Sequence, residues 1–473
     1  MKVKRESSRL VKPFYEGVHS PPTTLTAPLT VFDTVTFNSH VAVIYAYRPP
    51  TPPNSKVEKG LARALSEYRE WAGRLCRDPD HGRPAILLND AGALFVEASV
   101  DCTLDKALPF RPSPALLSLH PDLHGVDDHL VQVQLTRFKC GSLVVGFTAH
   151  HMVADGHATS SFLVAWGNAT RGVPMDPLPL HGRSAFLSPR DPPRVEFEHR
   201  GVEFMKAPNK KNLPSLQLLN GGVHDGAEEE EEEGVRLVVG EREDVIVHKA
   251  HFTVDFLAKL KASASSSPGV RGNIAAVPVN GRPFSTFECL VAHLWRTTTR
   301  ARELGGQETT QVRISVNGRG RLAPQVPADY FGNLVLWAFP RAKVWELLGQ
   351  PLGHAAGLIR DAVSRVNNAY FRSFVDFASS GAVEAEGLVP TADMEKMVLY
   401  PNLEVDSWLR FPFYEVDFGG GGPYIFMPTY FPVEGMLFLL PSFIGDGSID
   451  AFVPLFQQNL PTFKNLCYAL DLF

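Results

Sequence analysis

The chain has 473 residues, of which 44% are hydrophobic and 21% are charged, with 38 Gly and 38 Pro. These values are typical of a folded protein and exclude collagen-like and disordered chains, while the length favours two domains or two lobes. The 46 Lys and Arg against 51 Asp and Glu give a formal charge of −5, which indicates no general attraction to nucleic acid or anionic lipid.

The first 17 residues contain no apolar stretch typical of a signal peptide, and no apolar run in the chain approaches membrane-spanning length. The five cysteines lie far apart and include no CxxC pair, which favours reduced thiols over disulfides or a zinc site. We therefore expect a soluble, cytoplasmic protein with no bound metal and no membrane contact.

Strand and helix patterns alternate through the first 205 residues. Residues 41–47 and 143–147 are short, apolar and β-branched, so we predict that they form buried strands. Residues 57–76 carry apolar side chains at helical spacing with charges on the opposite face, which predicts one helix. A second amphipathic helix is predicted over residues 159–170.

One stretch differs sharply in composition from the rest. Residues 206–234 end in six consecutive glutamates. Because like charges repel and resist burial, we predict a solvated connection here, with an acidic docking patch as the alternative. This linker divides the chain into an N-terminal lobe, residues 1–205, and a C-terminal lobe, residues 235–473.

In the second lobe, residues 289–300 and 355–366 are predicted to form helices. Strand-rich and helix-rich stretches are interspersed without a regular βαβ rhythm, so the expected fold class is mixed α/β (α+β). The chain has no GxGxxG that opens a helix after a strand and no GxxxxGK[ST], which argues against Rossmann and P-loop sites.

Residues 150–156 read HHMVADG and stand between a predicted strand and a predicted helix. A histidine at such a junction can project into a cleft, and its neutral imidazole, with a pKa of roughly 6.5, can accept a proton. The alternative is a pair of ordinary buried histidines. A zinc site would need further ligands, and the chain has no GxSxG nucleophile elbow. A general base without a protein nucleophile favours direct transfer between two bound substrates.

Residues 417–423 read DFGGGGP and lie between segments dense in aromatic residues. Four consecutive glycines permit unusual backbone angles and a close approach of the main chain to another group. Taken alone, this segment is equally well interpreted as a flexible turn.

HHMVADG followed much later by DFGGGGP resembles the HxxxD and DFGWG motifs of the BAHD acyltransferases, plant enzymes that use acyl-CoA donors. Further segments resemble the family in the same order along nearly the whole chain: PLT at 28–30 with Asp33, YAYRP at 45–49, STFE at 285–288, HLWR at 293–296, NGRGRL at 317–322 and YFGN at 330–333. Chloramphenicol acetyltransferase and condensation domains share HHxxxDG but not this series. Within the family, the chain is most similar to the branch that attaches hydroxycinnamoyl groups to amines such as putrescine, agmatine or tryptamine.

The resemblance implies a two-lobe, chloramphenicol-acetyltransferase-like fold with a solvent channel between the lobes and a long crossover loop, which matches residues 206–234. It implies that His151 lies mid-channel as the general base, with CoA entering from one face and the acceptor from the other. It also implies a monomer with no bound cofactor, acyl-CoA as co-substrate, and only small molecules as partners.

Other site residues follow from the same resemblance. Asp155 is expected to point away from the channel and to brace its loop against Arg319, and Asp417 and Gly419 are expected to be structural. Gly420 departs from the family because it stands where Trp is usual. We expect a looser loop there, and therefore expect Gly420→Trp to raise thermal stability.

Trp408 is the candidate donor to the oxyanion, since the matching Ser-Trp segment of hydroxycinnamoyltransferases places its indole N–H near that oxygen; core packing is the alternative. His40 matches a channel-lining histidine of the family. Ser285 and Thr286 fall in a stretch that lines the CoA side in relatives.

The charge of the residues at the expected acceptor-binding positions indicates which kind of acceptor the site takes. Relatives that act on shikimate hold its carboxylate with an arginine fifteen positions before that tryptophan, and ungapped counting from Trp408 leads to Asp393. Asp406 replaces a hydroxyl residue that contacts the same acceptor. Two aspartates would repel a carboxylate and favour a cation. The alternative is that both are solvated loop carboxylates.

The expected function is therefore transfer of a p-coumaroyl or feruloyl group from CoA to an amine such as putrescine or agmatine. Alternatives that stay open are a tryptamine or tyramine N-acyltransferase using hydroxycinnamoyl or benzoyl groups, an O-hydroxycinnamoyltransferase, and a non-catalytic ligand-binding relative.

Overall fold

The computed structural model describes residues 1–473 except positions 18, 81 and 109 and residues 122–127, 208–243, 266–281, 393–398 and 471–473. Most of the expected linker, residues 206–234, therefore lies outside the described residues. Asp393 lies outside them as well.

The first sheet has six strands in the order β1-β6-β7-β8-β3-β16. The pair β6–β7 is parallel and the other neighbours are antiparallel. The predicted strands 41–47 and 143–147 are confirmed as parts of β3 and β8. The strand bounds are β1 Val3–Val11, β3 His40–Tyr47, β6 Ala93–Val100, β7 Val131–Phe138, β8 Leu143–His150 and β16 Ile425–Pro428.

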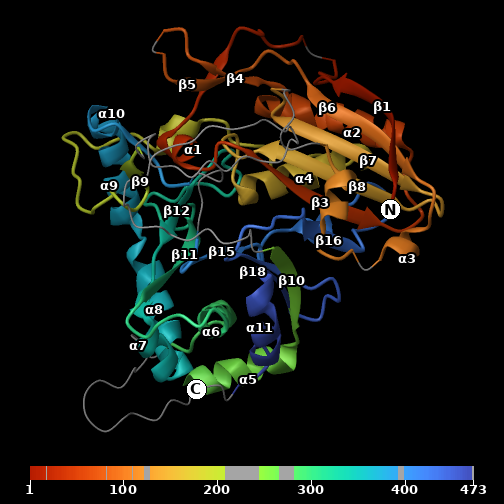
Figure 1. The fold of residues 1–473 in the computed structure, drawn as a ribbon. Helices are drawn as coiled ribbons and strands as arrows, with labels where there is room; N and C mark the ends of the chain where they lie inside the picture. Colours follow the sequence, from red (N-terminus) through yellow and green to blue (C-terminus); the bar gives the residue numbers. More distant parts are fainter. Residues whose placement is uncertain are drawn as a thin grey trace, which may run out of the picture.

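Helices α2 (Asn54–Glu67) and α4 (Gly156–Arg171) pack against each other beside this sheet (Figure 1). The predicted helix 159–170 is confirmed within α4. The prediction of one helix over 57–76 is wrong at its C-terminal end, because α2 stops at Glu67 and a 3₁₀ turn, Arg69–Ala72, follows. Tyr68 leaves helical geometry with φ −107° and ψ 61°.

The second sheet has the order β10-β18-β17-β15-β11-β12, and β13 pairs with β11. Its strands are β10 Val245–Phe252, β11 Thr309–Asn317, β12 Val335–Ala338, β13 Arg341–Lys343, β15 Leu403–Ser407, β17 Met436–Pro441 and β18 Ile449–Phe456. Helices α5 (Val254–Ser265), α6 (Thr286–Ala301), α8 (Leu352–Arg365) and α11 (Leu460–Leu466) gather below it in Figure 1. The helices predicted over 289–300 and 355–366 are confirmed as α6 and α8.

Shorter elements complete the described fold. Two small sheets have the orders β2-β5-β4 and β14-β9. Their strands are β2 Thr26–Pro28, β4 Arg74–Arg77, β5 Pro84–Leu87, β9 Phe204–Lys206 and β14 Leu388–Pro390. The remaining α-helices are α1 Val31–Val35, α3 Leu104–Ala107, α7 Val344–Gly349, α9 Asn368–Ser379 and α10 Ala382–Ala385.

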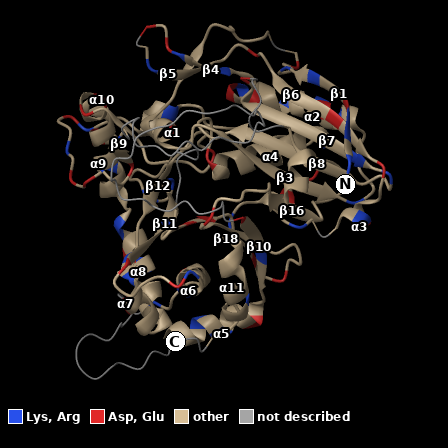
Figure 2. Cartoon of the chain, viewed as in Figure 1, with Lys and Arg blue, Asp and Glu red and all other residues tan. Residues whose placement is uncertain are grey.

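Strand β16 joins the two halves of the chain. This strand comes from the second half of the sequence, yet it pairs antiparallel with β3 at the edge of the first sheet. One hydrophobic core accordingly contains residues from both halves, among them Val144, Phe418 and Phe426. In Figure 2, Lys and Arg are interspersed with Asp and Glu, in keeping with the small net charge. None of the described helices is long and apolar enough to cross a membrane.

Candidate functional site

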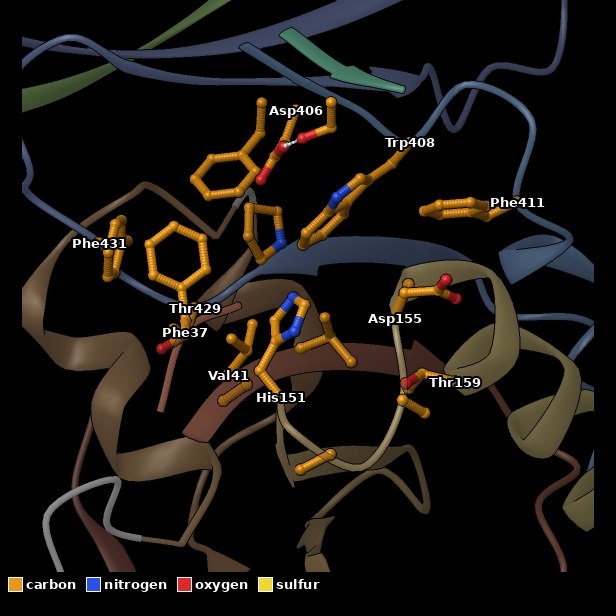
Figure 3. Close-up of a pocket in the computed structure, with 18 of the residues that line it drawn as sticks. Phe37, Val41, His151, Asp155, Thr159, Asp406, Trp408, Phe411, Thr429 and Phe431 are labelled. Atoms are coloured by element: carbon orange, nitrogen blue, oxygen red, sulfur yellow. Dashed lines mark hydrogen bonds between the residues drawn. The ribbon is translucent and has the colours of Figure 1, made fainter. Parts of the chain in front are cut away.

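A pocket lies between the two sheets, with walls that are mainly apolar and aromatic (Figure 3). The first sheet and the segments next to it contribute His151 and His40, while β11 and β15 contribute Ser315 and Asp406. The aromatic lining residues are Phe37, Phe147, Trp337, Trp408, Phe411, Phe413, Phe431 and Phe438.

His151 follows the last residue of β8, and its backbone is held at both ends. Its N–H donates to the Ser39 carbonyl (2.9 Å), and its carbonyl accepts from Nδ2 of Asn333 (2.9 Å). The imidazole Nδ1 lies 3.1 Å from Oγ1 of Thr36. Burial lowers the pKa of His151, although the nearby charges of Asp406 and Asp155 act in the opposite direction. The imidazole is therefore neutral at pH 7, as a general base must be.

The other two histidines near the site have different surroundings. His150 packs edge-on against His40, with ring centroids 4.8 Å apart, and burial lowers the pKa of His150 to about 3. His40 lines the pocket, and its Nε2 lies 2.7 Å from the His129 carbonyl. Of the adjacent pair His150 and His151, only the second lines the pocket.

Asp155 is the N-cap of α4, where its Oδ1 accepts from the Ala158 N–H (2.9 Å). Its Oδ2 lies 2.7 Å from Nη1 of Arg319 and accepts from the Leu334 N–H (3.0 Å). Figure 3 shows the carboxylate directed away from the His151 ring. The ion pair between Asp155 and Arg319 is present and ties the loop after His151 to the second half of the chain.

Two carboxylates stand on one face of β15, because residues two apart in a strand point the same way. Oδ1 of Asp406 accepts from the Ser315 hydroxyl (2.6 Å), and burial raises the pKa of Asp406. Glu404 is completely buried, and neither of its carboxylate oxygens has a hydrogen-bond partner among the described residues. Burial raises its pKa to about 7, despite the Arg313 guanidinium 3.5 Å away.

Glu404 does not line the pocket but lies buried on the same strand as Asp406, and sequence reasoning did not single it out. The available signal was the pattern Leu403–Ser407, LEVDS, in which two acidic residues occupy alternate positions of an otherwise apolar strand. Such a pattern places both carboxylates on the same face of a buried sheet.

Trp408 follows β15 and lines the pocket. Its ring packs against Phe413, Phe426 and Phe438, with centroids 5.8, 5.9 and 5.1 Å away. Figure 3 shows the indole above the His151 imidazole. The position is compatible with both roles considered for this residue, oxyanion donor and packing.

Asp417 is not among the residues that line the pocket. Its Oδ1 accepts from the N–H groups of Gly419 (2.6 Å), Gly420 (3.1 Å) and Gly421 (2.9 Å). Its Oδ2 pairs with Arg171 of α4 (3.2 Å). The aspartate thus closes the glycine loop and fastens it to the helix that follows HHMVAD.

The expectation of a looser loop that Gly420→Trp would stabilise is wrong. A Cβ built on Gly420 would lie 1.9 Å from the Pro50 carbonyl oxygen, a backbone atom that no side-chain rotation can move. The loop packs so closely on the Pro49-Pro50 segment that it has no room for any side chain at this position.

Ser285 and Thr286 lie at the start of α6 and do not line the pocket. The Ser285 hydroxyl accepts from the Glu288 N–H (3.2 Å), and Glu288 accepts from the Ser285 N–H (2.7 Å). This capping box gives Ser285 and Glu288 a structural role at the start of the helix. A contact of Ser285 or Thr286 with CoA stays a prediction. The described residues contain no group of three His, Cys, Asp or Glu arranged to hold a metal ion.

A model of the Transferase family matches residues 1–470. Agmatine hydroxycinnamoyltransferase 1 of Oryza sativa subsp. japonica is 54% identical, and the match covers 99% of each chain. The chain belongs to the BAHD acyltransferases. Another member, putrescine hydroxycinnamoyltransferase of the same rice, is also 54% identical over 100% of both chains.

A solved structure with the same fold is that of F. sporotrichioides TRI101, in a complex with coenzyme A and T-2. It aligns with a TM-score of 0.70 and 18% identity over 92% of this chain and 96% of that chain. The expected mixed α/β, two-lobe BAHD fold is thereby confirmed.

Proposed function

We propose that this chain transfers a hydroxycinnamoyl group from its CoA thioester to an aliphatic amine that carries a second, distal positive charge, such as putrescine or agmatine. The observation that carries the proposal is the carboxylate of Asp406, which lines the pocket that holds His151. Glu404 is fully buried two residues earlier on the same strand, behind the pocket wall. The similarity to agmatine and putrescine hydroxycinnamoyltransferases supports it.

His151 acts as the general base in this proposal. Its neutral imidazole removes a proton from the amine nitrogen as that nitrogen attacks the thioester carbonyl. The C–N bond forms, the C–S bond breaks, and the proton passes from His151 to the leaving sulfur. The indole N–H of Trp408 donates to the oxyanion of the tetrahedral intermediate. Because free amines have pKa values near 10, as a lysine does, the rate should rise toward alkaline pH.

The acceptor's distal charge is bound by Asp406, with Glu404 as a second carboxylate one strand pleat, roughly 7 Å, further along β15. An acceptor cation that binds beside this carboxylate, in a region of low dielectric constant, forms an ion pair that a neutral or anionic acceptor cannot form. Asp393 is proposed as a further acidic contact. These charges disfavour shikimate, whose carboxylate would be repelled.

The apolar and aromatic pocket walls suit a planar hydroxycinnamoyl group. Ser285 and Thr286 are proposed to lie along the path of CoA, and His40 to line the channel. We further propose that the lobes are residues 1–205 and 235–473 joined by residues 206–234, and that the enzyme is a cytoplasmic monomer.

The test is release of CoA from p-coumaroyl-CoA with putrescine, agmatine, tryptamine, tyramine and shikimate as separate acceptors. Turnover is expected with the two cationic aliphatic amines, and loss of turnover in His151→Ala. His157→Ala is the matched control, because His157 lies on α4 and is not among the pocket-lining residues. Turnover with shikimate alone would overturn the proposed acceptor, and full activity of His151→Ala would overturn the proposed base.

A further inference from the structure

The two ring nitrogens of His151 face different parts of the molecule. Nδ1 lies 3.1 Å from the Thr36 hydroxyl, at the end of α1. In Figure 3 the far end of the ring, which carries Nε2, extends toward the space below Trp408 and Asp406. A base accepts a proton at a lone pair, so the reactive tautomer has its proton on Nδ1 and its lone pair on Nε2.

Thr36 is held firmly in place. Helix α1 begins with a capping box between Thr30 and Asp33. Oδ1 of Asp33 accepts from both the backbone N–H (2.9 Å) and Nδ2 (3.0 Å) of Asn333. The same Nδ2 donates to the His151 carbonyl. One asparagine therefore fixes both the helix that ends at Thr36 and the backbone of His151.

The carboxylates around the imidazole are engaged elsewhere. Both oxygens of Asp155 are used by Arg319, Ala158 and Leu334. Asp406 accepts a hydrogen bond from Ser315 of the neighbouring strand, on the wall of the pocket that faces His151. The Thr36 hydroxyl lies 3.1 Å from Nδ1. Hydrogen bonding by the Asn333 side chain and by the His151 backbone also acts to raise the pKa of this imidazole.

We propose that Thr36 is a positioning residue for acyl transfer, whose hydroxyl oxygen accepts a hydrogen bond from Nδ1–H of His151 and so keeps Nε2 unprotonated toward the substrates. This inference rests on the proposed function of His151. The hydroxyl accepts the same bond when Nε2 takes the amine proton and the ring becomes imidazolium. After Nε2–H passes to the leaving sulfur, the ring returns to its starting tautomer without rotating.

The test compares Thr36→Val, which keeps the shape and removes the hydroxyl, with Thr36→Ser, which keeps the hydroxyl. For Thr36→Val we expect a fall in kcat of roughly 10- to 100-fold with the KM values for amine and thioester unchanged, since a wrong tautomer removes base catalysis. The acid limb of the kcat–pH profile should move to lower pH, because the imidazolium loses its acceptor. Asp406 and Asp155, which also act on the His151 charge, are unaltered in this variant. Thr36→Ser should retain most of kcat.

Thr34→Val is the matched control, because Thr34 lies on the same short helix and its hydroxyl donates to the Val31 carbonyl (3.2 Å) rather than to His151. Nitrogen-15 NMR of the imidazole adds a readout that does not depend on turnover: the share of the Nε2–H tautomer should rise in Thr36→Val only. Unchanged kcat, pH profile and tautomer in Thr36→Val would overturn the inference, and so would equal losses in Thr34→Val. If the wild-type enzyme turns over no amine, the proposed function fails, while the NMR comparison still decides the role of Thr36.

Discussion

Asp406 and Glu404 are neighbours on β15, but the protein stabilises their charges differently. Asp406 accepts a short hydrogen bond from Ser315, whereas Glu404 has only the Arg313 guanidinium at 3.5 Å. Arg313 itself lies over the Trp337 ring, 3.9 Å from its centroid, and its Nε and Nη2 atoms have no hydrogen-bond partner among the described residues. Buried charges with incomplete partners are costly, and such groups are typical of binding sites rather than of plain cores.

Asp406→Asn should separate charge recognition from catalysis. The amide keeps the size of the side chain but removes its negative charge, so kcat/KM for putrescine should fall by about 100-fold, the cost of leaving a partly desolvated ammonium without a counter-ion. With butylamine, which has no distal charge, kcat/KM should change by less than about threefold, because no ion pair is lost. Steady-state kinetics with both amines measures the difference. Equal losses with the two amines would instead assign Asp406 to the electrostatics of His151.

The residues also show what a sequence can and cannot reveal about a site. His151 and Asp155 were predictable because their signal is local. The short segment HHMVADG contains both residues and stands at a strand-to-helix junction. Glu404 was missed because its importance depends on burial beside Arg313, which comes from another strand. Asp393 was selected by ungapped counting and lies outside the described residues, so its role stays a prediction.

At the scale of elements, apolar periodicity located the long helices and central strands well. It failed after Glu67, because Tyr68, Trp71 and Ala72 are buried like helical residues although the chain has left the α-helix. Tyr68 packs edge-on against Phe162 and Phe331, both at 5.1 Å, and Phe331 is more than 250 positions away in sequence. A long-range contact of this kind leaves no local signal in the sequence.

The glycine loop after Asp417 gives the clearest prediction for an element. Gly420→Ala should lower the free energy of unfolding by about 1–3 kcal/mol, because the new Cβ meets the Pro50 carbonyl oxygen and one of the two segments must move. Gly420→Trp should be at least as destabilising. Since Asp417 and its loop lie outside the pocket, kcat of the folded fraction should stay near the wild-type value.

Gly357→Ala is the matched control for this experiment. Gly357 lies within α8, and a Cβ there would meet nothing within 4 Å. Alanine should therefore stabilise the helix, by about 0.5–1 kcal/mol. Denaturant unfolding of the two variants should show opposite signs. A stabilised Gly420→Ala protein would mean that the loop can move to accommodate a side chain at this position.

On the scale of the whole molecule, the loop that carries His151 and Asp155 is held in place by contacts from both halves of the chain. β16 extends the first sheet, Arg319 pairs with Asp155, and Asn333 bonds to both Asp33 and His151. These contacts join segments separated by 164 to more than 300 positions. Because His151 is positioned by these long-range contacts, loss of the packing between the halves should disable the base before either sheet unfolds.

Stability should fall as the pH is lowered from 7 to 5. Burial lowers the pKa of six described histidines. The pKa falls to about 3 for His150 and to about 4 for His293, and it is also below its usual value for His40, His151, His157 and His248. Below the unfolded value of roughly 6.5, the unfolded chain binds protons that the native protein does not, so the free energy of unfolding decreases. The raised pKa values of His181, Glu404 and Asp406 act in the opposite direction but involve fewer groups.

Replacing one of these histidines isolates the effect. In His150→Gln, the loss of stability between pH 7 and pH 5 should shrink by about 2 kcal/mol relative to the wild type, since the unfolded state no longer gains a proton at this position. His19→Gln, at an exposed position, is the matched control and should keep the wild-type pH dependence. Thermal and denaturant unfolding at several pH values provide the measurement. A wild-type stability that is flat or rises from pH 7 to pH 5 would mean that the raised carboxylates and His181 outweigh the buried histidines, and the acid sensitivity argued here would be wrong.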